Sequence, residues 1–245
     1  DSVRIETTGT ATLTLNIDGV DFQGSRGDLL EVSALGNSTH DIEIHDSTFD
    51  NAHANIVSGG GGVLLAGDDD VNVDYLVEGS SFSGASGHAL GASYLIASGT
   101  VQGRIEGNVI GNNDGIAGVE GSSGGGSGIH VRLEHTTGTG DATYAVAIVD
   151  NSIYDIAQGI SAIDIQASSD NGAFDVVMEA DVDGNVVDEM GDFVFAALYA
   201  SVGGAAGSGD FSQLGLDITD NVFDLGDADF GGNAIFLNQF SSDSR

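Results

Sequence analysis

The stretches IVDNSI (148–153), VDGNVV (182–187) and ITDNVF (218–223) share one pattern, and this pattern decides the fold. In each, a segment that alternates apolar and polar residues is followed by Gly or Asp and then by Asn. An apolar residue stands two positions after the Asn. Four earlier stretches keep the spacing, with Val, Ser or Asn at the Asn position: IDGVDF (17–22), IHDSTF (44–49), VEGSSF (77–82) and IEGNVI (105–110). Their closing apolar residues lie 27 to 43 residues apart, which indicates a repeat architecture with constant strands and variable loops.

Apolar and polar residues alternate before each motif, as at Leu13, Leu15 and Ile17. A period of two places alternate side chains on opposite faces of a strand, so one side of each strand points inward. A second apolar stretch follows each motif after a polar turn, for example LLEV (29–32) and GIHVRLE (128–134). Each repeat therefore has at least two strands with a corner between them, and the 39 glycines argue against helices.

In these motifs the chain resembles the right-handed parallel β-helix superfamily, which includes pectate lyases, polysaccharide epimerases, phage tailspikes and autotransporter passengers. The resemblance covers nearly the whole length. It implies an all-β fold, a single right-handed parallel β-helix (solenoid) of about seven coils with variable loops, in one domain over residues 1–245.

The resemblance also implies an asparagine ladder, in which side-chain amides of successive coils stack at one corner. The ladder residues are Asn108, Asn151, Asn185 and Asn221, preceded in the first three coils by Val20, Ser47 and Ser80. A local reason points the same way, because Asn tolerates the left-handed backbone that such a corner needs.

The charge of the chain excludes two classes of partner. Thirty-eight acidic residues stand against five Arg and no Lys, which gives a net charge of -33. Binding to a nucleic-acid backbone or an anionic membrane surface needs clustered Lys and Arg, so we expect neither partner. The acidity suits high salt, bound divalent cations or the solubility of a large extracellular surface, and composition leaves these three alternatives open.

Cellular location follows from the fold resemblance, which predicts an extracellular or cell-surface protein. No run approaches eighteen apolar residues, so we expect no membrane insertion. The chain begins at Asp1 rather than Met, and we expect a processed product or a segment of a longer exported protein. With no Cys there is no disulfide framework.

Two acidic clusters are candidate Ca²⁺ sites, because hard oxygen ligands on a flexible loop suit this cation. The residues are Asp68, Asp69 and Asp70 in one loop and Asp224, Asp227 and Asp229 in another. Neither cluster has the spacing of a known calcium loop, and a solvated acidic loop is the reading we favour. No cofactor is required by any motif, and Ca²⁺ is the one that composition permits.

The six histidines form no group with the spacing of a zinc site, which needs three convergent ligands. His53 and His88 lie at similar positions beyond Phe49 and Phe82, so these two could stack in neighbouring coils. We favour ordinary surface histidines with polar partners.

Strand 128–134 is the candidate active site. If its aliphatic residues face inward, His130, Arg132 and Glu134 face outward together, and alignment with the next coil places Asp164 beside Arg132. In enzymes that this fold resembles, such groups do the chemistry, with Arg or His taking a proton and carboxylates acting as acid and base. The alternative, which we favour, is an ion pair between Arg132 and Asp164 that relieves charge on the sheet.

The segment FVFAALYA (193–200) is apolar on both faces. With Phe193, Phe195 and Ala197 inward, Val194 and Leu198 face outward, and something must cover them. We expect the loop 201–213 to fold back as a lid on a monomer, with association of chains through Val194 and Leu198 as the alternative.

Three functions remain open. We favour a non-catalytic structural or adhesive segment of an exported bacterial surface protein, with a glycan or cell-surface partner. The alternatives are a polysaccharide lyase, hydrolase or epimerase, and a subunit of a fibrous assembly. The charge repels a polyanionic substrate, whereas a neutral glycan needs aromatic side chains. With no Trp, the candidates beside Phe are Tyr75, Tyr94, Tyr144, Tyr154 and Tyr199.

Overall fold

The computed structural model of the chain consists of β-strands joined by turns and loops. It describes residues 1–51, 60–113, 121–122, 125–135, 140–169, 175–191, 193–204, 212–225 and 232–240. No helix occurs in these ranges, and so none that is long and apolar enough to cross a membrane. The predicted all-β class is confirmed.

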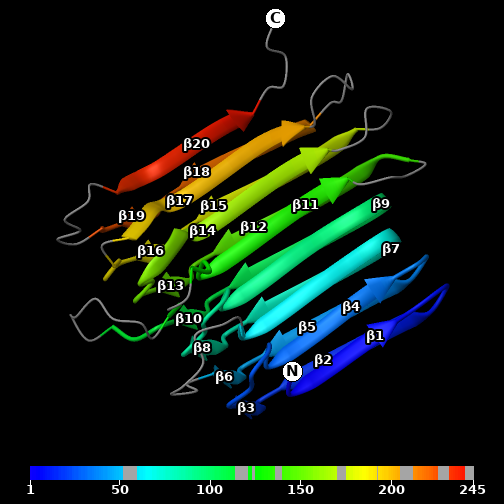
Figure 1. The fold of residues 1–245 in the computed structure, drawn as a ribbon, viewed down its shortest axis with the longest axis horizontal. Coiled ribbons are helices and arrows are strands. Elements are labelled where there is room, and N and C mark those ends of the chain that lie inside the picture. Colours follow the sequence, from blue (N-terminus) through cyan, green and yellow to red (C-terminus); the bar gives the residue numbers. More distant parts are fainter. Residues whose placement is uncertain are drawn as a thin grey trace, which may run out of the picture.

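The strands fall into three rows, each formed by parallel pairing (Figure 1). The first row is β1 (Val3–Thr7), β4 (Leu30–Leu35), β7 (Val63–Glu78), β9 (Leu90–Glu106), β11 (Ile129–His135), β14 (Gln158–Ser169), β17 (Phe193–Gly204) and β20 (Asn233–Phe240). The second contains β2 (Thr12–Asp18), β5 (Thr39–His45), the second halves of β7 and β9, β12 (Ala142–Val149), β15 (Val176–Asp183) and β18 (Ser212–Thr219). The third contains β3 (Asp21–Gln23), β6 (Thr48–Asp50), β8 (Ser81–Ser83), β10 (Val109–Ile110), β13 (Ser152–Ile153), β16 (Val186–Val187) and β19 (Val222–Phe223).

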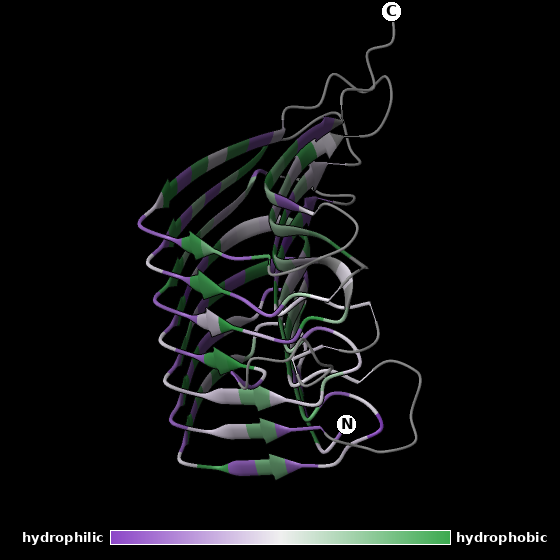
Figure 2. Cartoon of the chain, turned by 90° about the vertical axis from the view of Figure 1, so that its left-hand side faces the viewer, coloured by the Kyte–Doolittle hydropathy of each residue, from purple (hydrophilic) through white to green (hydrophobic). Residues whose placement is uncertain are grey.

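Consecutive strands visit the three rows in turn, so the chain builds layers, each with one strand segment from every row (Figure 2). β1, β2 and β3 form the first layer, and β17, β18 and β19 form the seventh, to which β20 adds a last strand. Each strand pairs with the equivalent strand of the layers before and after it. This arrangement is compatible with a parallel β-helix.

The core lies between the rows and consists of the inward half of each alternation. The motif-closing residues share one line, along which Phe22, Phe49 and Phe82 stack with ring centroids 4.9 and 5.0 Å apart. Phe49, Phe82 and Ile110 are fully buried, as is Ile153 in the next layer. Burial of each such side chain contributes roughly 1.5–3 kcal/mol, which makes this line a main source of stability.

The predicted line of asparagine amides is present. Oδ1 of Asn151 accepts from the backbone N and the Nδ2 of Asn108, both at 3.0 Å, and Asn185 does the same for Asn151. Asn221 accepts from Asn185 at 2.9 Å in the same way. In the earlier layers Ser47 accepts from the backbone N of Val20, so hydroxyls fill the place of the amides.

The local reason given for these asparagines was wrong by one residue. Positive φ angles occur at the preceding Gly or Asp, for example 53° at Asp150 and 67° at Gly184, and not at the asparagines. The corner therefore needs two residue types in succession, one that tolerates the left-handed backbone and one that supplies an amide.

The expected orientation of strand 193–200 was also wrong. Val194 and Leu198 are 6% and 0% exposed and face inward, whereas Phe195 is 45% exposed on the outer side. Leu198 pairs with the buried Ile163, which fixes this register. Because Val194 and Leu198 are already buried in the core, they need neither a lid nor a second chain to cover them. Residues 205–211 of the expected lid lie outside the described residues.

Three of the five tyrosines lie inside the core rather than on the surface. Tyr75, Tyr94 and Tyr144 are at most 4% exposed, and the hydroxyls of Tyr75 and Tyr144 share a hydrogen bond. The loss of solvation on burial raises the pKa of all three phenols. None of them can form the aromatic surface that a glycan would need.

We predict that Asn151→Leu lowers the free energy of unfolding by about 1–3 kcal/mol, because the backbone N and Nδ2 of Asn108 lose their acceptor and Oδ1 of Asn185 loses one of its donors. Urea unfolding measures the change. Asn16→Leu, at an exposed position of β2, is the control and should stay within about 0.5 kcal/mol of wild type. Equal stability of Asn151→Leu and wild type would contradict a structural role for the amide line.

Candidate functional site

The outer face of the first row carries histidine, carboxylate and aromatic side chains close together. One line across this face runs from His130 on β11 to Asp164 on β14, Tyr199 on β17 and Phe236 on β20. Neighbouring parallel strands lie about 4.8 Å apart, so these four side chains span about 14 Å. The parallel register thus assembles an extended site from residues more than a hundred positions apart.

His130 and Asp164 are in contact, with 2.9 Å between Nδ1 of the ring and Oδ2 of the carboxylate. Asp164 is 1% exposed, and Nε2 of Gln166 donates to both of its oxygens at 3.0 and 3.1 Å. A carboxylate oxygen accepts hydrogen bonds, so Nδ1–H of His130 donates to Asp164 and Nε2 is the ring nitrogen left to exchange a proton. The pair therefore presents an oriented general base.

The sequence alignment that placed Asp164 beside Arg132 was wrong by two residues. Ile129, not Val131, pairs with Ile163, so Asp164 lies beside His130 and Gln166 beside Arg132. A shift of the strand pairing by two residues keeps every side chain on the same face of the sheet. The alternation of apolar and polar residues therefore does not distinguish the two registers.

The expected ion pair between Arg132 and Asp164 is replaced by one between Arg132 and Glu134, two residues along the same strand. The Arg132 and Glu134 side chains are 36% and 13% exposed, so the guanidinium is accessible from solvent. All four predicted site residues thus lie on one face, but His130 with Asp164 and Arg132 with Glu134 form separate pairs.

His88 joins the site from the turn before β9. Its ring stacks on that of His130, with centroids 4.2 Å apart and planes 14° from parallel, rather than on His53, which lies outside the described residues. Nδ1 of His88 accepts a hydrogen bond from the backbone N of Ser127 at 2.9 Å. Burial, aided by the repulsion of His130 and opposed by Asp164, lowers the pKa of His88 to about 4.

An aromatic cluster continues the site across β17 and β20. Phe195 packs edge-on against Phe236 at 4.6 Å between centroids, and Tyr199 stacks on Phe236 at 5.9 Å. This cluster was not predicted, because the outward face of β17 was taken for the inward one. Val194, Ala196, Leu198, Ala200 and Val202 form an unbroken aliphatic set, and this signal could have identified the inward side.

Among the described residues, Asp68, Asp69 and Asp70 do not form a group whose carboxylates converge. Asp68, Asp69 and Asp70 lie within β7, not in a loop, and a register shift separates Asp69 from Asp70. Within the described ranges, the one group of three carboxylates that meets within 4.8 Å is Asp1, Asp28 and Glu31. Asp224 is exposed, whereas Asp227 and Asp229 lie outside the described residues, so Ca²⁺ binding stays a prediction.

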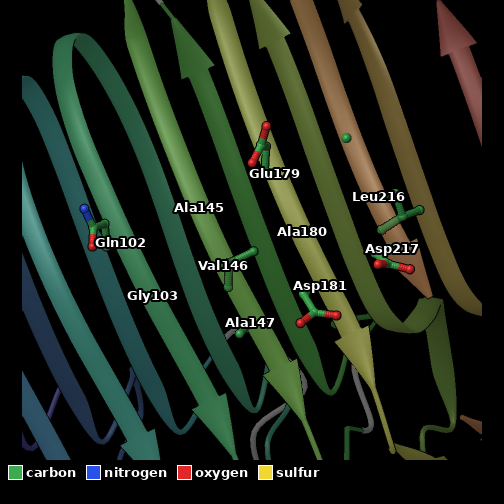
Figure 3. Close-up of a pocket in the computed structure, with 11 residues that line it drawn as sticks. Gln102, Gly103, Ala145, Val146, Ala147, Glu179, Ala180, Asp181, Leu216 and Asp217 are labelled. Atoms are coloured by element: carbon green, nitrogen blue, oxygen red, sulfur yellow. The ribbon is translucent and has the colours of Figure 1, made fainter. Parts of the chain in front are cut away.

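A hollow of about 670 Å³ lies on the outer face of the second row (Figure 3). Small residues such as Ala145 and Ala147 line it, together with Glu179, Asp181 and Asp217 from β15 and β18. Its lining has neither a histidine nor an aromatic ring. The hollow therefore offers carboxylates, but neither the imidazole nor the aromatic rings that the first row provides.

Comparisons with known proteins give no family for this chain. No protein-family model matches it, and no match is found among curated proteins or solved structures. The function must be argued from the site itself.

We predict that acid weakens the fold through His88. Its folded-state pKa of about 4 lies below the ordinary 6.5, so between these values the unfolded chain binds the proton more readily. Stability is full above about pH 6.5 and falls by up to about 3 kcal/mol as the pH approaches 4. Urea unfolding at pH 7.5, 5.5 and 4 measures this slope.

His88→Asn is the matched variant for this prediction, because its amide oxygen can still accept from Ser127 but does not titrate. We expect a shallower loss of stability between pH 6.5 and 4 than in wild type. The same slope in both proteins would assign the acid sensitivity to other groups.

Proposed function

We propose that the chain is a right-handed parallel β-helix domain of an exported surface protein that binds a neutral glycan on the outer face of its first row. Right-handedness is the rule for parallel strands joined by crossover connections. The role is adhesive, and the location is extracellular or on the cell surface.

The observation that supports this proposal most directly is the cluster of Phe195, Tyr199 and Phe236. Beside it lie the polar side chains of Arg132, Gln166 and Asn238, which together form a polar strip. Aromatic faces stack on the apolar faces of sugar rings, while amides and hydroxyls pair with sugar hydroxyls. Gln166 lies in the strip beside Arg132, and the Nδ2 of Asn238 lies 3.5 Å from the hydroxyl of Tyr199. Rings and amides on one accessible face favour a carbohydrate over a purely apolar ligand.

Charge favours a neutral glycan over an acidic one. The chain carries a net charge of -33, and the guanidinium of Arg132 in the strip is already paired with Glu134. A polyanion would meet a repulsive field with one partly neutralised cation to oppose it. We therefore expect neutral polysaccharides to bind and alginate or polygalacturonate not to bind.

Affinity electrophoresis in gels that contain a soluble neutral polysaccharide, with xyloglucan, mannan and dextran tried in turn, tests the proposal. We expect one of them to retard the wild type and Phe195→Ala to weaken the binding at least tenfold, because a central aromatic contact is lost. Val109→Ala, which trims a 43% exposed side chain on the third row, should bind as wild type does. Absence of retardation in every neutral gel, or equal retardation of Phe195→Ala and wild type, would exclude this site.

A second candidate, a polysaccharide hydrolase, is favoured by the geometry of His130. Asp164 holds Nδ1 of His130, which leaves Nε2 as the ring nitrogen that can take up a proton, and Glu134 is a carboxylate on the same face. A base that activates water and an acid that protonates the leaving oxygen are the two groups that glycoside hydrolysis needs.

We predict that, if this candidate is correct, the wild type releases new reducing ends from the polysaccharide that it binds. His130→Gln should then lose this activity by at least a hundredfold and still be retarded in the gel, because the base is lost and the aromatic cluster stays. Binding with no release of reducing ends, after prolonged incubation between pH 5 and 8, assigns the site to adhesion alone.

A further inference from the structure

Two histidine rings lie one above the other beside the polar strip. His88 precedes β9 and His130 lies on β11, and their ring centroids are 4.2 Å apart with planes 14° from parallel. Gly91 pairs with His130 and has no side chain, so the outer face of β9 is open at this position. The Cβ position of Gly91 lies 3.9 Å from Cβ of His88, and the side chain of His88 fills this open place.

Each of the two rings has one nitrogen engaged by the protein. Nδ1 of His88 accepts a hydrogen bond from the backbone N of Ser127 at 2.9 Å, whereas Nδ1–H of His130 donates to Asp164 at 2.9 Å. Burial lowers the pKa of His88 to about 4, so this ring is neutral at neutral pH. A neutral imidazole has one N–H and one lone pair. Nε2 of His88 therefore carries a hydrogen, and Nε2 of a neutral His130 carries a lone pair.

This pair of tautomers does not suit a metal ion. A metal ligand must offer a lone pair, and the single lone pair of the neutral His88 ring is already used by Ser127. Of the two rings, only that of His130 has a nitrogen left as a ligand, whereas a zinc site needs at least three protein ligands. What the two rings offer together is one hydrogen-bond donor beside one acceptor.

The chemistry of a ligand that fits this pair is narrowly defined. It must accept a hydrogen bond from His88 and donate one to His130. A carboxylate accepts but does not donate, an ammonium group donates but does not accept, and a hydroxyl group does both. Because the rings lie one above the other, two hydroxyls on adjacent atoms, one for each ring, fit better than a single hydroxyl between the ring planes.

A ligand can reach the pair from the outer side of the sheet. The side chain of His130 is 11% exposed, and His88 is half-buried. Asp164 is 1% exposed and accepts two hydrogen bonds from Gln166, so the partner of His130 is fixed before a ligand arrives. Fixed donors and acceptors reduce the conformational entropy that binding costs.

We propose that His88 and His130 form a subsite for two adjacent hydroxyls of a sugar ring. Nε2–H of His88 donates to one hydroxyl, and Nε2 of His130 accepts from its neighbour. The subsite rests on the glycan binding proposed above and adds to it the chemical group that is recognised, a vicinal diol. The hydrogen bond of His130 with Asp164 polarises the imidazole ring and strengthens the bond that its Nε2 accepts.

The distance between this subsite and the aromatic cluster sets a minimum length for the ligand. His130 and Tyr199 share one line and lie two strands apart, which is about 10 Å at the spacing of parallel strands. One sugar ring is too short to contact both residues. We therefore expect an oligosaccharide that lies along the stack axis to bind more tightly than a monosaccharide.

Nitrogen NMR of the imidazole rings tests the two tautomers without any ligand. At neutral pH we expect His88 to carry its hydrogen on Nε2 and His130 to carry its hydrogen on Nδ1, which long-range proton–nitrogen correlation spectra distinguish. Another protonation state of either ring would overturn the subsite, because the donor and the acceptor would no longer face the ligand. That result leaves glycan binding by Phe195 and Tyr199 unaffected.

Competition in the affinity gel tests the diol. In a gel whose neutral polysaccharide retards the wild type, we expect methyl α-mannopyranoside, which has a cis and a trans diol, to release the protein. Its 2,3-di-O-methyl ether accepts hydrogen bonds at both oxygens but donates none, so it loses the bond to Nε2 of His130. Release by the ether should need a concentration roughly three- to tenfold higher, the effect of one hydrogen bond.

His88→Phe and His45→Phe are matched variants for this experiment. His88→Phe keeps an aromatic ring beside His130 but has no N–H, so competition by the mannoside should weaken roughly three- to tenfold. His45 is a half-buried histidine on the second row, and His45→Phe should behave as wild type does. If His88→Phe does not fold, the comparison of mannoside and ether on the wild type decides alone.

Four outcomes would overturn the subsite and leave the proposed glycan binding in place. They are no release by the mannoside, equal release by mannoside and ether, a folded His88→Phe that behaves as wild type does, and release by acetamide in place of the mannoside, which would assign the pair to an amide ligand. A wild type that no neutral polysaccharide retards overturns the subsite together with the proposed function.

Discussion

The pairing of each strand with its equivalent in the next layer is the interaction on which the rest of this structure depends. It fixes, for every residue, one neighbour above and one below, so that the stack consists of lines of side chains parallel to its axis. Inward lines are mostly apolar, because a polar group inside loses its water and needs a partner, as His40 has in Oγ1 of Thr7 at 2.6 Å. Exceptions such as the amides of Asn108 and Asn151 are satisfied by members of their own line.

The same lines explain how the candidate site forms on the outer face of the first row. His130 and Asp164 meet because their strands are neighbours, and Tyr199 follows because it is the next member of the line. The backbone pairing holds all three at fixed spacing, so little conformational entropy remains to be lost when a ligand binds. An elongated ligand parallel to the axis is the shape that such a surface fits.

Much of the fold was predictable, because the period-two alternation and the recurring Asn corner are local signals. The number of layers, the members of the asparagine line and the outward placement of His130 and Arg132 all follow from them. The axial register was not predictable from alternation alone, and a shift of two residues moved Asp164 from Arg132 to His130. The face of β17 was assigned wrongly because Phe195 and Leu198 are both apolar, although the unbroken aliphatic set on the side of Leu198 indicates the inward face and the pairing of Leu198 with Ile163 agrees with it.

In the middle layers, a large inward side chain of one layer occupies space that a small residue of the next layer leaves open. A Cβ on Gly103 would lie 2.2 Å from the ring of Tyr75, so the layer with the glycine provides the room that the tyrosine of the preceding layer occupies. Tyr144, one layer further on, reaches back past this glycine to the hydroxyl of Tyr75. Repeat proteins grow and shrink by gain or loss of whole units, but here the third, fourth and fifth layers are not interchangeable. Gain or loss of one layer between the third and the fifth would therefore leave Tyr75 without this room.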